Sequence, residues 1–350
     1  MLIEQKPFGR TRSGGEAFLY TMQNDRGMRA VVTNYGAILV SLFVPGADGV
    51  SRDVVLGYDT LSEYEADGFL GATVGRHANR ISGAAFTLDG KRYALIDNDN
   101  GCNLHSDFQK GFHKQLWDAE ILPNGVRFFR LSPDGECGFP GNLRISVSYL
   151  LERDNSLRIL YEGASDRMTV INLTNHSFFN LAGHDAGSIL SETLTLHCGR
   201  FLEIREGILP TGRILSVEGT PMDFRDGRRI GDRIDADSDQ LRFASGYDHC
   251  WVTGAQPGAL RHIASVEDRR SGLRMDTLTD LPGVQIYTAN FLSRRQGKGG
   301  AVYTPRCALC LETEYFPDSL RHPDFPQPVF APGEIYRAET VYRFSQTTKS

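Results

Sequence analysis

LRISVSYLLERDNSLRILYEG (residues 143–163) contains two short runs rich in β-branched, aromatic and aliphatic residues, separated by a charged and polar segment. Val, Ile and Tyr favour strands, whereas Asp, Asn and Ser favour turns. The runs LRISVSYLL (143–151) and SLRILYEG (156–163) therefore predict two neighbouring strands that are joined by a turn at ERDNS (152–156).

The same pattern recurs along most of the chain, whereas helical periodicity is scarce. Comparable runs are RAVVTNYGAILVSLFV (29–44), VQIYTANFL (284–292) and ALCLETEYF (308–316), with turn signals such as PGADG (45–49) and SPDGECGFPGN (132–142) between them. No fixed internal period indicates a propeller or a solenoid. Many short strands at this spacing predict an all-β protein, either a large antiparallel β-sandwich or a barrel, and not βαβ units.

The domain organisation is less constrained, because 350 residues suffice for one large β domain or two medium ones. The turn-rich stretch 203–240 is the best candidate for a boundary. It carries apolar residues throughout and lacks the low complexity of a flexible linker. We therefore expect it to be an ordered excursion within a single domain over residues 1–350.

Charge and composition restrict the partners. The chain has 38 Lys and Arg against 43 Asp and Glu, a formal charge of -5, so no basic surface is expected to bind nucleic acid or anionic lipid. The N-terminal segment has no apolar h-region and no run is long enough to cross a bilayer. Six sparse cysteines suit free thiols in a reducing compartment. We expect a cytoplasmic protein, monomeric or homodimeric, that acts on a small neutral molecule.

Known cofactor and metal motifs are missing from the sequence. There is no phosphate-binding G-x-x-x-x-G-K-[ST], no esterase-type G-x-S-x-G and no H-E-x-x-H or H-x-H. Cys307 and Cys310 form a C-x-x-C, but ALCLETEYF is expected to be a buried strand on which an offset of three sends the two thiols to opposite faces. We therefore expect no metal site.

Several polar or charged residues interrupt otherwise apolar or glycine-rich stretches. In NLTNHSFFNLAG (172–183), Asn172, Thr174 and His176 occupy every second position, so a strand here has one polar face. Glu312 follows an apolar run in ALCLETEYF, where an ionised side chain is costly unless it is paired or used. Further candidates of this kind are Asn79, Arg80, His105, Asp248 and Gln285.

Each candidate also has a purely structural interpretation. Arg80 could neutralise a nearby Asp, His105 could cap backbone groups after a turn, and Gln285 could satisfy backbone groups at a sheet edge. Asp248 is equally suited to an Asx-turn, and His176 to a core histidine bonded to a carbonyl. Taken singly, these residues do not decide between structure and chemistry.

Taken together, the segments resemble the aldose 1-epimerase (galactose mutarotase) family over nearly the whole chain. The resemblance is carried, in order, by VVTNYGAILVSLFVPGADG (31–49), DVVLGYDTLSEY (53–64), VGRHANRISGAAFTLDGKRYAL (74–95), NLHSDFQKGFHKQLW (103–117), SPDGECGFPGNL (132–143), NLTNHSFFNLAG, GYDHCW (246–251), VQIYTANFL and LETEYFPDS (311–319). It implies a β-sandwich of that family, a monosaccharide in an open cleft, and neither metal nor organic cofactor.

The resemblance also implies roles for individual residues. His176 becomes the general acid and Glu312 the general base. The residues implied to contact the sugar are Arg80, His105, Asp248 and Gln285, with Asn79 beside them and Ser177 and Phe178 flanking the acid. The sequence departs from the family at LHSD (104–107), at Phe178, where Tyr is common, and at Cys137, where a polar or acidic residue is usual.

This pair suits the interconversion of α and β anomers, which needs one base at the anomeric hydroxyl and one acid at the ring oxygen. It predicts a bell-shaped dependence of turnover on pH. Three alternatives remain open at this point: an epimerase for hexose 6-phosphates, a non-catalytic sugar-binding module, and a glycoside hydrolase with two facing carboxylates. Arg80 is the one basic residue of this set, which favours a free sugar over a phosphorylated one.

Overall fold

The hairpin predicted from residues 143–163 is present in the computed structural model, which describes residues 2–347. It consists of β13 (Leu143–Leu151) and β14 (Ser156–Ser165), paired antiparallel. Ile145, Val147 and Tyr149 are buried on one face of β13, while Arg144 and Ser148 point to the other. One face of the hairpin thus lines a core and the other faces outward.

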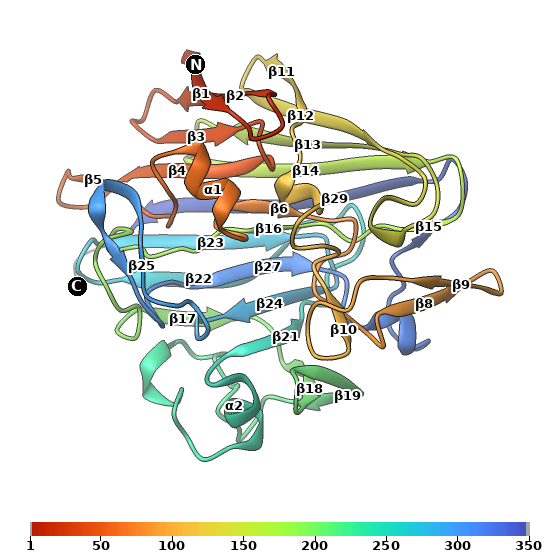
Figure 1. Cartoon of the computed structure of the whole chain (residues 1–350). Coiled ribbons are helices and arrows are strands. Elements are labelled where there is room, and N and C mark those ends of the chain that lie inside the picture. Colours follow the sequence, from red (N-terminus) through yellow and green to blue (C-terminus); the bar gives the residue numbers. More distant parts are fainter. Residues whose placement is uncertain (1, 348–350) are drawn as a thin grey trace.

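This hairpin belongs to a nine-stranded sheet that forms one layer of the molecule (Figure 1). Its order is β11-β12-β13-β14-β29-β23-β22-β17-β20, and all its neighbours are antiparallel. The remaining members are β11 (Asp118–Leu122), β12 (Gly125–Ser132), β29 (Ile335–Gln346), β23 (Leu273–Thr279), β22 (Arg261–Asp268), β17 (Thr193–Leu196) and β20 (Arg228–Arg229).

The second layer lies in front of this sheet in Figure 1 and is built from three smaller sheets. The first contains β1 (Leu2–Arg10), β2 (Glu16–Gln23), β3 (Arg29–Thr33), β4 (Ile38–Pro45) and β5 (Ser51–Asp53). The second is the pair β6 (Ala72–Val74) and β16 (Thr174–His176). The third has the order β19 (Leu209–Ser216), β18 (Arg200–Arg205), β21 (Asp248–Val252), β24 (Gly283–Tyr287), β27 (Cys310–Glu314).

One hydrophobic core joins the two layers, because Val147 and Tyr342 of the nine-stranded sheet pack in the same cluster as Trp251 and Ile286 of the front layer. Burial of large apolar side chains on the inner faces of two sheets is what holds a β-sandwich together. The predicted fold class, an all-β antiparallel sandwich, is confirmed.

Short elements complete the chain. Two-stranded pairs are β7 (Arg80–Ser82) with β10 (Cys102–Leu104), β8 (Ala85–Leu88) with β9 (Lys91–Ala94), β15 (Thr169–Val170) with β28 (Val329–Phe330), and β25 (Arg295–Gln296) with β26 (Val302–Tyr303). The α-helices are α1 (Leu61–Ala66) and α2 (Asp239–Ala244). Within residues 2–347, no helix has the length and apolar character that crossing a bilayer requires. The stretch 203–240 contains β19, β20 and the end of β18.

The C-x-x-C segment differs from its prediction. Strand β27 begins at Cys310, and Cys307 lies in the turn before it, where Arg306 has a left-handed φ of 63°. The two thiols are therefore not on opposite faces of one strand; both are buried in one hydrophobic cluster. No disulfide links any of the six cysteines in the described part of the chain.

Candidate active site

A cavity of about 450 Å³ opens where strands of the front layer meet the loops around β7 and β10. Eight of the nine predicted site residues line it: Asn79, Arg80, His105, His176, Phe178, Asp248, Gln285 and Glu312. They come from segments more than 200 residues apart in the sequence. The fold thus brings together residues that a single strand or loop could not place side by side.

Three adjacent strands supply one wall of the cavity. Gln285 on β24 lies directly opposite Glu312 on β27, and β21 on the other side of β24 carries Asp248. The Gln285 amide nitrogen donates a hydrogen bond of 2.7 Å to the Asp248 carboxylate. Gln285 therefore bonds an acidic side chain of the cavity instead of backbone groups at a sheet edge, and its strand lies between the two strands that carry Asp248 and Glu312.

His176 ends strand β16, and its ring is held between two phenylalanine rings. Phe178 stacks on it with centroids 5.0 Å apart and an interplanar angle of 16°, and Phe69 stacks with 5.7 Å and 17°. Burial among apolar groups disfavours the charged imidazolium and lowers the pKa of His176 to about 4. Its Nδ1 lies 3.6 Å from the Cys310 sulfur, which leaves Nε2 to face Glu312.

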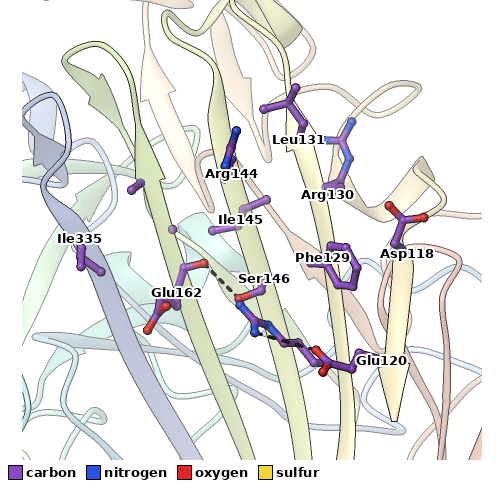
Figure 2. Close-up of a pocket in the computed structure, with 13 residues that line it drawn as sticks. Asp118, Glu120, Phe129, Arg130, Leu131, Arg144, Ile145, Ser146, Glu162 and Ile335 are labelled. Carbon is purple, nitrogen blue, oxygen red and sulfur yellow. Dashed lines mark hydrogen bonds and ion pairs between the residues drawn. The ribbon is translucent and has the colours of Figure 1, made fainter. Parts of the chain in front are cut away.

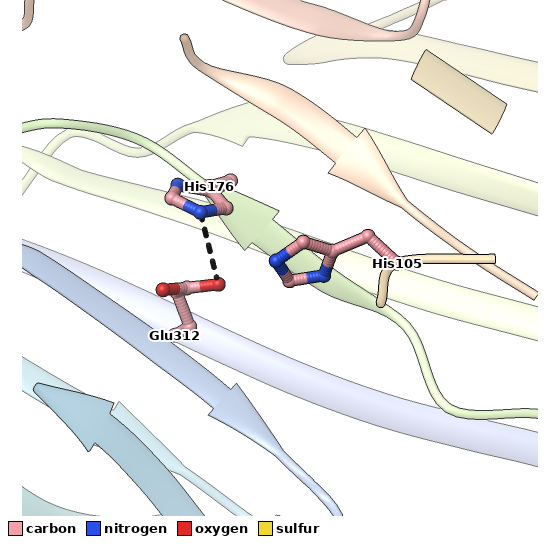
Figure 3. A group of neighbouring side chains, drawn as sticks. All are labelled: His105, His176 and Glu312. Carbon is pink, nitrogen blue, oxygen red and sulfur yellow. Dashed lines mark ion pairs between the residues drawn. The ribbon is translucent and has the colours of Figure 1, made fainter. Parts of the chain in front are cut away.

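Glu312 lies opposite this nitrogen, with its Oε2 atom 3.5 Å from His176 Nε2 (Figure 3). Burial, followed by the nearby charges of Glu314 and Asp248, raises the pKa of Glu312 well above its usual value. Glu312 has a raised pKa and His176 a lowered pKa. Together they favour a pair that shares one titratable proton and carries no net charge. Such a pair contains one proton to give and one site to receive it.

His105 is a third member of this group, with its Nε2 directed toward the other two (Figure 3). Its Nδ1 accepts the backbone N–H of Asn79 at 3.0 Å, so the ring proton must reside on Nε2. Burial and the neighbouring His176 hold the pKa of His105 well below its usual value. His105 is therefore a neutral hydrogen-bond donor aimed into the cavity.

The same tautomer bears on metal binding. His105, His176 and Glu312 offer three atoms within 4.8 Å of one another, and no other such grouping occurs among the described residues. A metal needs a lone pair on the nitrogen that faces it, whereas Nε2 of His105 carries the proton. These three residues do not fit a metal ion without breaking the bond from Asn79.

Arg80 and Asn79 line the cavity, and both side chains are held by bonds to carboxylates. Arg80 Nε donates to Asp99 at 2.7 Å, so the structural role considered for Arg80 is present alongside its place in the cavity lining. Asn79 has a left-handed φ of 63°, and its side-chain nitrogen donates to Glu314 Oε1 at 2.9 Å.

Ser177 is the exception among the predicted residues. Its side chain lies outside the cavity lining and donates instead to Asn175 Oδ1 at 2.6 Å. Residues 176 and 177 are neighbours on an extended segment, so their side chains point to opposite sides. We therefore assign the Ser177 hydroxyl to holding Asn175, which in turn donates to the Gly71 carbonyl.

Several residues of the cavity were missed by sequence reasoning: Asp67, Phe69, Tyr287, Phe291 and Arg295. The expectation that Arg80 is the one basic residue of the site is wrong, because Arg295 also lines the cavity and forms an ion pair with Asp67. Phe69 and Asp67 lie in the segment after α1. No polar residue interrupts an apolar run there, and such an interruption is the signal that indicates the other site residues.

A larger hollow of about 590 Å³ lies on the outer face of the nine-stranded sheet (Figure 2). It mixes apolar side chains such as Phe129 and Leu131 with ionic groups, including an ion pair of Arg127 with Glu120 at 4.0 Å. Its lining contains no histidine and no fully buried acid. The acid and base that proton transfer needs occur together in the smaller cavity.

Comparison with known proteins gives a consistent result. The family model described as aldose 1-epimerase matches residues 19–343. The chain is 39% identical to galactose mutarotase from Bos taurus, with 93% of each chain covered, and 36% identical to aldose 1-epimerase from Escherichia coli K12, with 93% of this chain and 94% of that protein covered.

Solved structures agree with this result. An aldose epimerase homologue from C. elegans superposes with a TM-score of 0.87 at 28% identity, covering 95% of this chain and 100% of that one. Galactose 1-epimerase from Lactobacillus acidophilus gives a TM-score of 0.85 at 26% identity, with 99% of each chain covered.

Proposed function

Because the chain belongs to the aldose 1-epimerase family, we propose that it interconverts the α and β anomers of free aldohexoses such as glucose and galactose, with Glu312 as base and His176 as acid. The family and the enzyme class predicted from the sequence, an isomerase of the aldose 1-epimerase type, are confirmed by these relatives. The names of the relatives support the choice of sugar.

The reaction requires two proton transfers and no change of oxidation state. The Glu312 carboxylate removes the proton of the anomeric hydroxyl, while the His176 imidazolium protonates the ring oxygen. The bond from C1 to the ring oxygen breaks, and its electrons leave with that oxygen as C1 becomes an aldehyde carbon. After rotation about the C1–C2 bond, attack of the hydroxyl on the other face of C1 returns both protons.

The observation that carries this proposal is the pair formed by Glu312 and His176 inside a cavity lined by hydrogen-bonding residues. The pair holds one proton for the ring oxygen and one vacant site for the proton of the anomeric hydroxyl. Glu312 and His176 are 2% and 6% exposed, which keeps bulk water from competing in these transfers. Arg80, His105, Asp248 and Gln285, with Asn79, surround it as contacts for sugar hydroxyls. A non-catalytic sugar-binding module would need these contacts but neither member of the pair.

The direct test is polarimetry on freshly dissolved α-D-glucose and α-D-galactose, with and without the protein. Glu312→Gln and His176→Asn should each lower turnover about a hundredfold to ten-thousandfold, because a positioned acid or base contributes a factor of that size. Glu192→Gln provides a matched control, since Glu192 is equally buried but lies outside the cavity. Near-wild-type turnover in both site variants would exclude these roles.

The domain organisation, the oligomeric state and the location of the protein are further proposals. The chain is expected to be a single domain over residues 1–350, monomeric or homodimeric and located in the cytoplasm. The unpaired state of the six thiols in the described residues supports a reducing compartment. Size-exclusion chromatography with light scattering would determine the oligomeric state.

A further inference from the structure

A second glutamate lies two residues beyond Glu312 on β27. Side chains at positions i and i+2 of a strand point to the same face, with backbones about 6.6 Å apart. Glu312 is 2% exposed and Glu314 is 0% exposed. Two carboxylates removed from water on one face cannot both ionise easily, so they share their titration as a pair.

The hydrogen bonds of the two carboxyl groups are unequal. Asn79 donates its side-chain N–H to Glu314 Oε1 at 2.9 Å. The Oε2 atoms of both glutamates have no hydrogen-bond partner among residues 2–347, and that of Glu312 faces His176 Nε2 across 3.5 Å. The donor from Asn79 therefore distinguishes Glu314 from Glu312. A donor stabilises a carboxylate more than a carboxylic acid. Burial raises the pKa of both glutamates, and the hydrogen bond from Asn79 lowers that of Glu314, so Glu314 should ionise before Glu312.

We propose that Glu314 is a positioning residue of this site, which carries the buried negative charge that strengthens Glu312 as a base and so sets the upper pH limit of catalysis. The inference rests on the proposed function, in which Glu312 is that base. The direction of the shift agrees with it, because the charge of Glu314 follows burial as the next cause of the raised pKa of Glu312.

Other charged groups around the pair do not replace Glu314 in this role. Asp248 also raises the pKa of both glutamates, but Gln285 donates a hydrogen bond to its carboxylate and spreads its charge. Arg80 acts in the opposite direction and is itself paired with Asp99. The remaining titratable groups facing the pair from neighbouring elements are His105, His176, Cys250, Cys310, Tyr287 and Tyr342.

The consequence concerns the alkaline side of the pH profile. The pair of His176 and Glu312 holds one proton from about pH 4, where the pKa of His176 lies, up to the raised pKa of Glu312. Above that upper value the last proton is lost and the acid has nothing to donate. Removing the charge of Glu314 lowers the pKa of Glu312, so this upper limit should move down.

The experiment compares kcat/KM against pH for the wild type and Glu314→Gln, whose amide oxygen still accepts the Asn79 hydrogen bond. We expect the alkaline limb to fall by about one to two pH units, while the acid limb stays near pH 4 and the plateau changes less than about tenfold.

Glu192→Gln is the matched control. Glu192 is also fully buried, accepts one N–H from Leu181 and has a pKa raised to about 8. Both limbs of the pH profile should nevertheless stay in place in this variant.

A second variant and a second measurement complete the test. Glu314→Asp keeps the charge and should leave the alkaline limb within about half a unit of the wild type. A Glu314→Gln limb that does not move, or a Glu314→Asp limb that moves equally far, would overturn the proposal.

The dependence of the melting temperature on pH provides a measurement independent of activity. Glu312, whose folded pKa the charge of Glu314 helps to raise, stabilises the fold below its unfolded value near 4.3, and this contribution is lost as the pH rises toward the folded pKa. Without the charge of Glu314 the folded pKa of Glu312 is lower, so less stability is lost with rising pH. Melting of Glu314→Gln should therefore fall less steeply than that of the wild type between pH 5 and 9. Unchanged steepness would refute the charge on Glu314 even if the protein lacked epimerase activity, and an inactive protein with the altered steepness would refute the proposed function alone.

Discussion

The imidazole of His176 illustrates how neighbours define a catalytic residue. Its ring edges contact a thiol and a carboxyl group, while both of its faces are covered by phenylalanine rings. Burial lowers its pKa to about 4, so in the free protein the shared proton rests mainly on Glu312. For the proposed reaction this proton must first move to His176, which gives the imidazolium and the carboxylate that the two transfers use. The acid limb of the predicted bell-shaped profile should accordingly lie near pH 4, more than two units below an ordinary histidine.

Phe69→Ala tests this covering at the level of one residue. Removal of the stacked ring admits water, which stabilises the imidazolium, so the acid limb of kcat/KM should rise from about pH 4 toward 6.5. Phe291→Ala is the control, because Phe291 lies at the same cavity but is 55% exposed and stacks on Tyr287 instead. An acid limb that stays near pH 4 in Phe69→Ala would show that this ring does not set the pKa.

Single residues also show what the sequence could and could not predict. His176 and Glu312 were recognisable because each polar side chain interrupts an apolar run. Arg295 was not, since it lies in a charged surface-like segment, and nothing local shows that tertiary contact with Asp67 brings it to the cavity. The family resemblance implies Ser177 as a flank of the acid, but alternation along the strand sends its side chain to the other side.

At the scale of elements, the segment after α1 connects two sides of the cavity. It places Phe69 against His176, and Asp67 against Arg295 at the start of β25. The Tyr58 hydroxyl also donates a hydrogen bond to the Asp67 carboxylate. Because Arg80 and Arg295 are both paired with acids, the positive charge available to a phosphorylated sugar is small, which favours free sugars.

Asp67→Asn tests this neutralisation. The substitution frees the Arg295 guanidinium within the cavity, so the ratio of kcat/KM for galactose 6-phosphate to that for galactose should rise about tenfold, as expected for one charge-assisted hydrogen bond. Asp235→Asn is the matched control, because it breaks an ion pair with Arg306 outside the cavity and should not alter the ratio. A wild type that already prefers the phosphorylated sugar would contradict the assignment to free sugars.

The strands themselves were predictable from local patterns, but their limits were set by backbone geometry. The runs at 143–151 and 156–163 became β13 and β14 almost residue for residue, since alternation and turn signals agree there. In ALCLETEYF the strand begins only at Cys310, after a turn that contains the left-handed residue Arg306. The order of strands in the sheets depends on contacts between distant segments, which the residue pattern alone did not reveal.

For the whole molecule, buried histidines link stability to acidity. His77 is fully buried, its ring nitrogens have no hydrogen-bond partners in the described part of the chain, and its pKa is lowered to about 4. In the unfolded chain its pKa returns to about 6.5. Because the folded pKa is the lower one, the contribution of His77 to stability is present above pH 6.5 and is lost as the pH falls toward 4.

His77→Phe should therefore reduce the loss of unfolding free energy between pH 7.5 and pH 5 by about 2 kcal/mol, as measured by urea titration at each pH. The same substitution at the exposed His197 should change this loss less, because its imidazole is only partly removed from water, although partial burial and the nearby His262 lower its pKa in the same direction. Equal effects of the two variants would contradict a role for burial.

The position of β29 has a consequence for how the chain acquires its structure. This strand, at residues 335–346, lies between β14 and β23 and completes the middle of the nine-stranded sheet. Its partner β14 is synthesised about 180 residues earlier, so one edge of β14 stays unpaired until β29 has been made. Pairings so distant in sequence make folding slow and leave strand edges exposed on the nascent chain. A ribosome-bound chain that ends before residue 335 should be sensitive to proteases and recruit chaperones, becoming compact once β29 emerges.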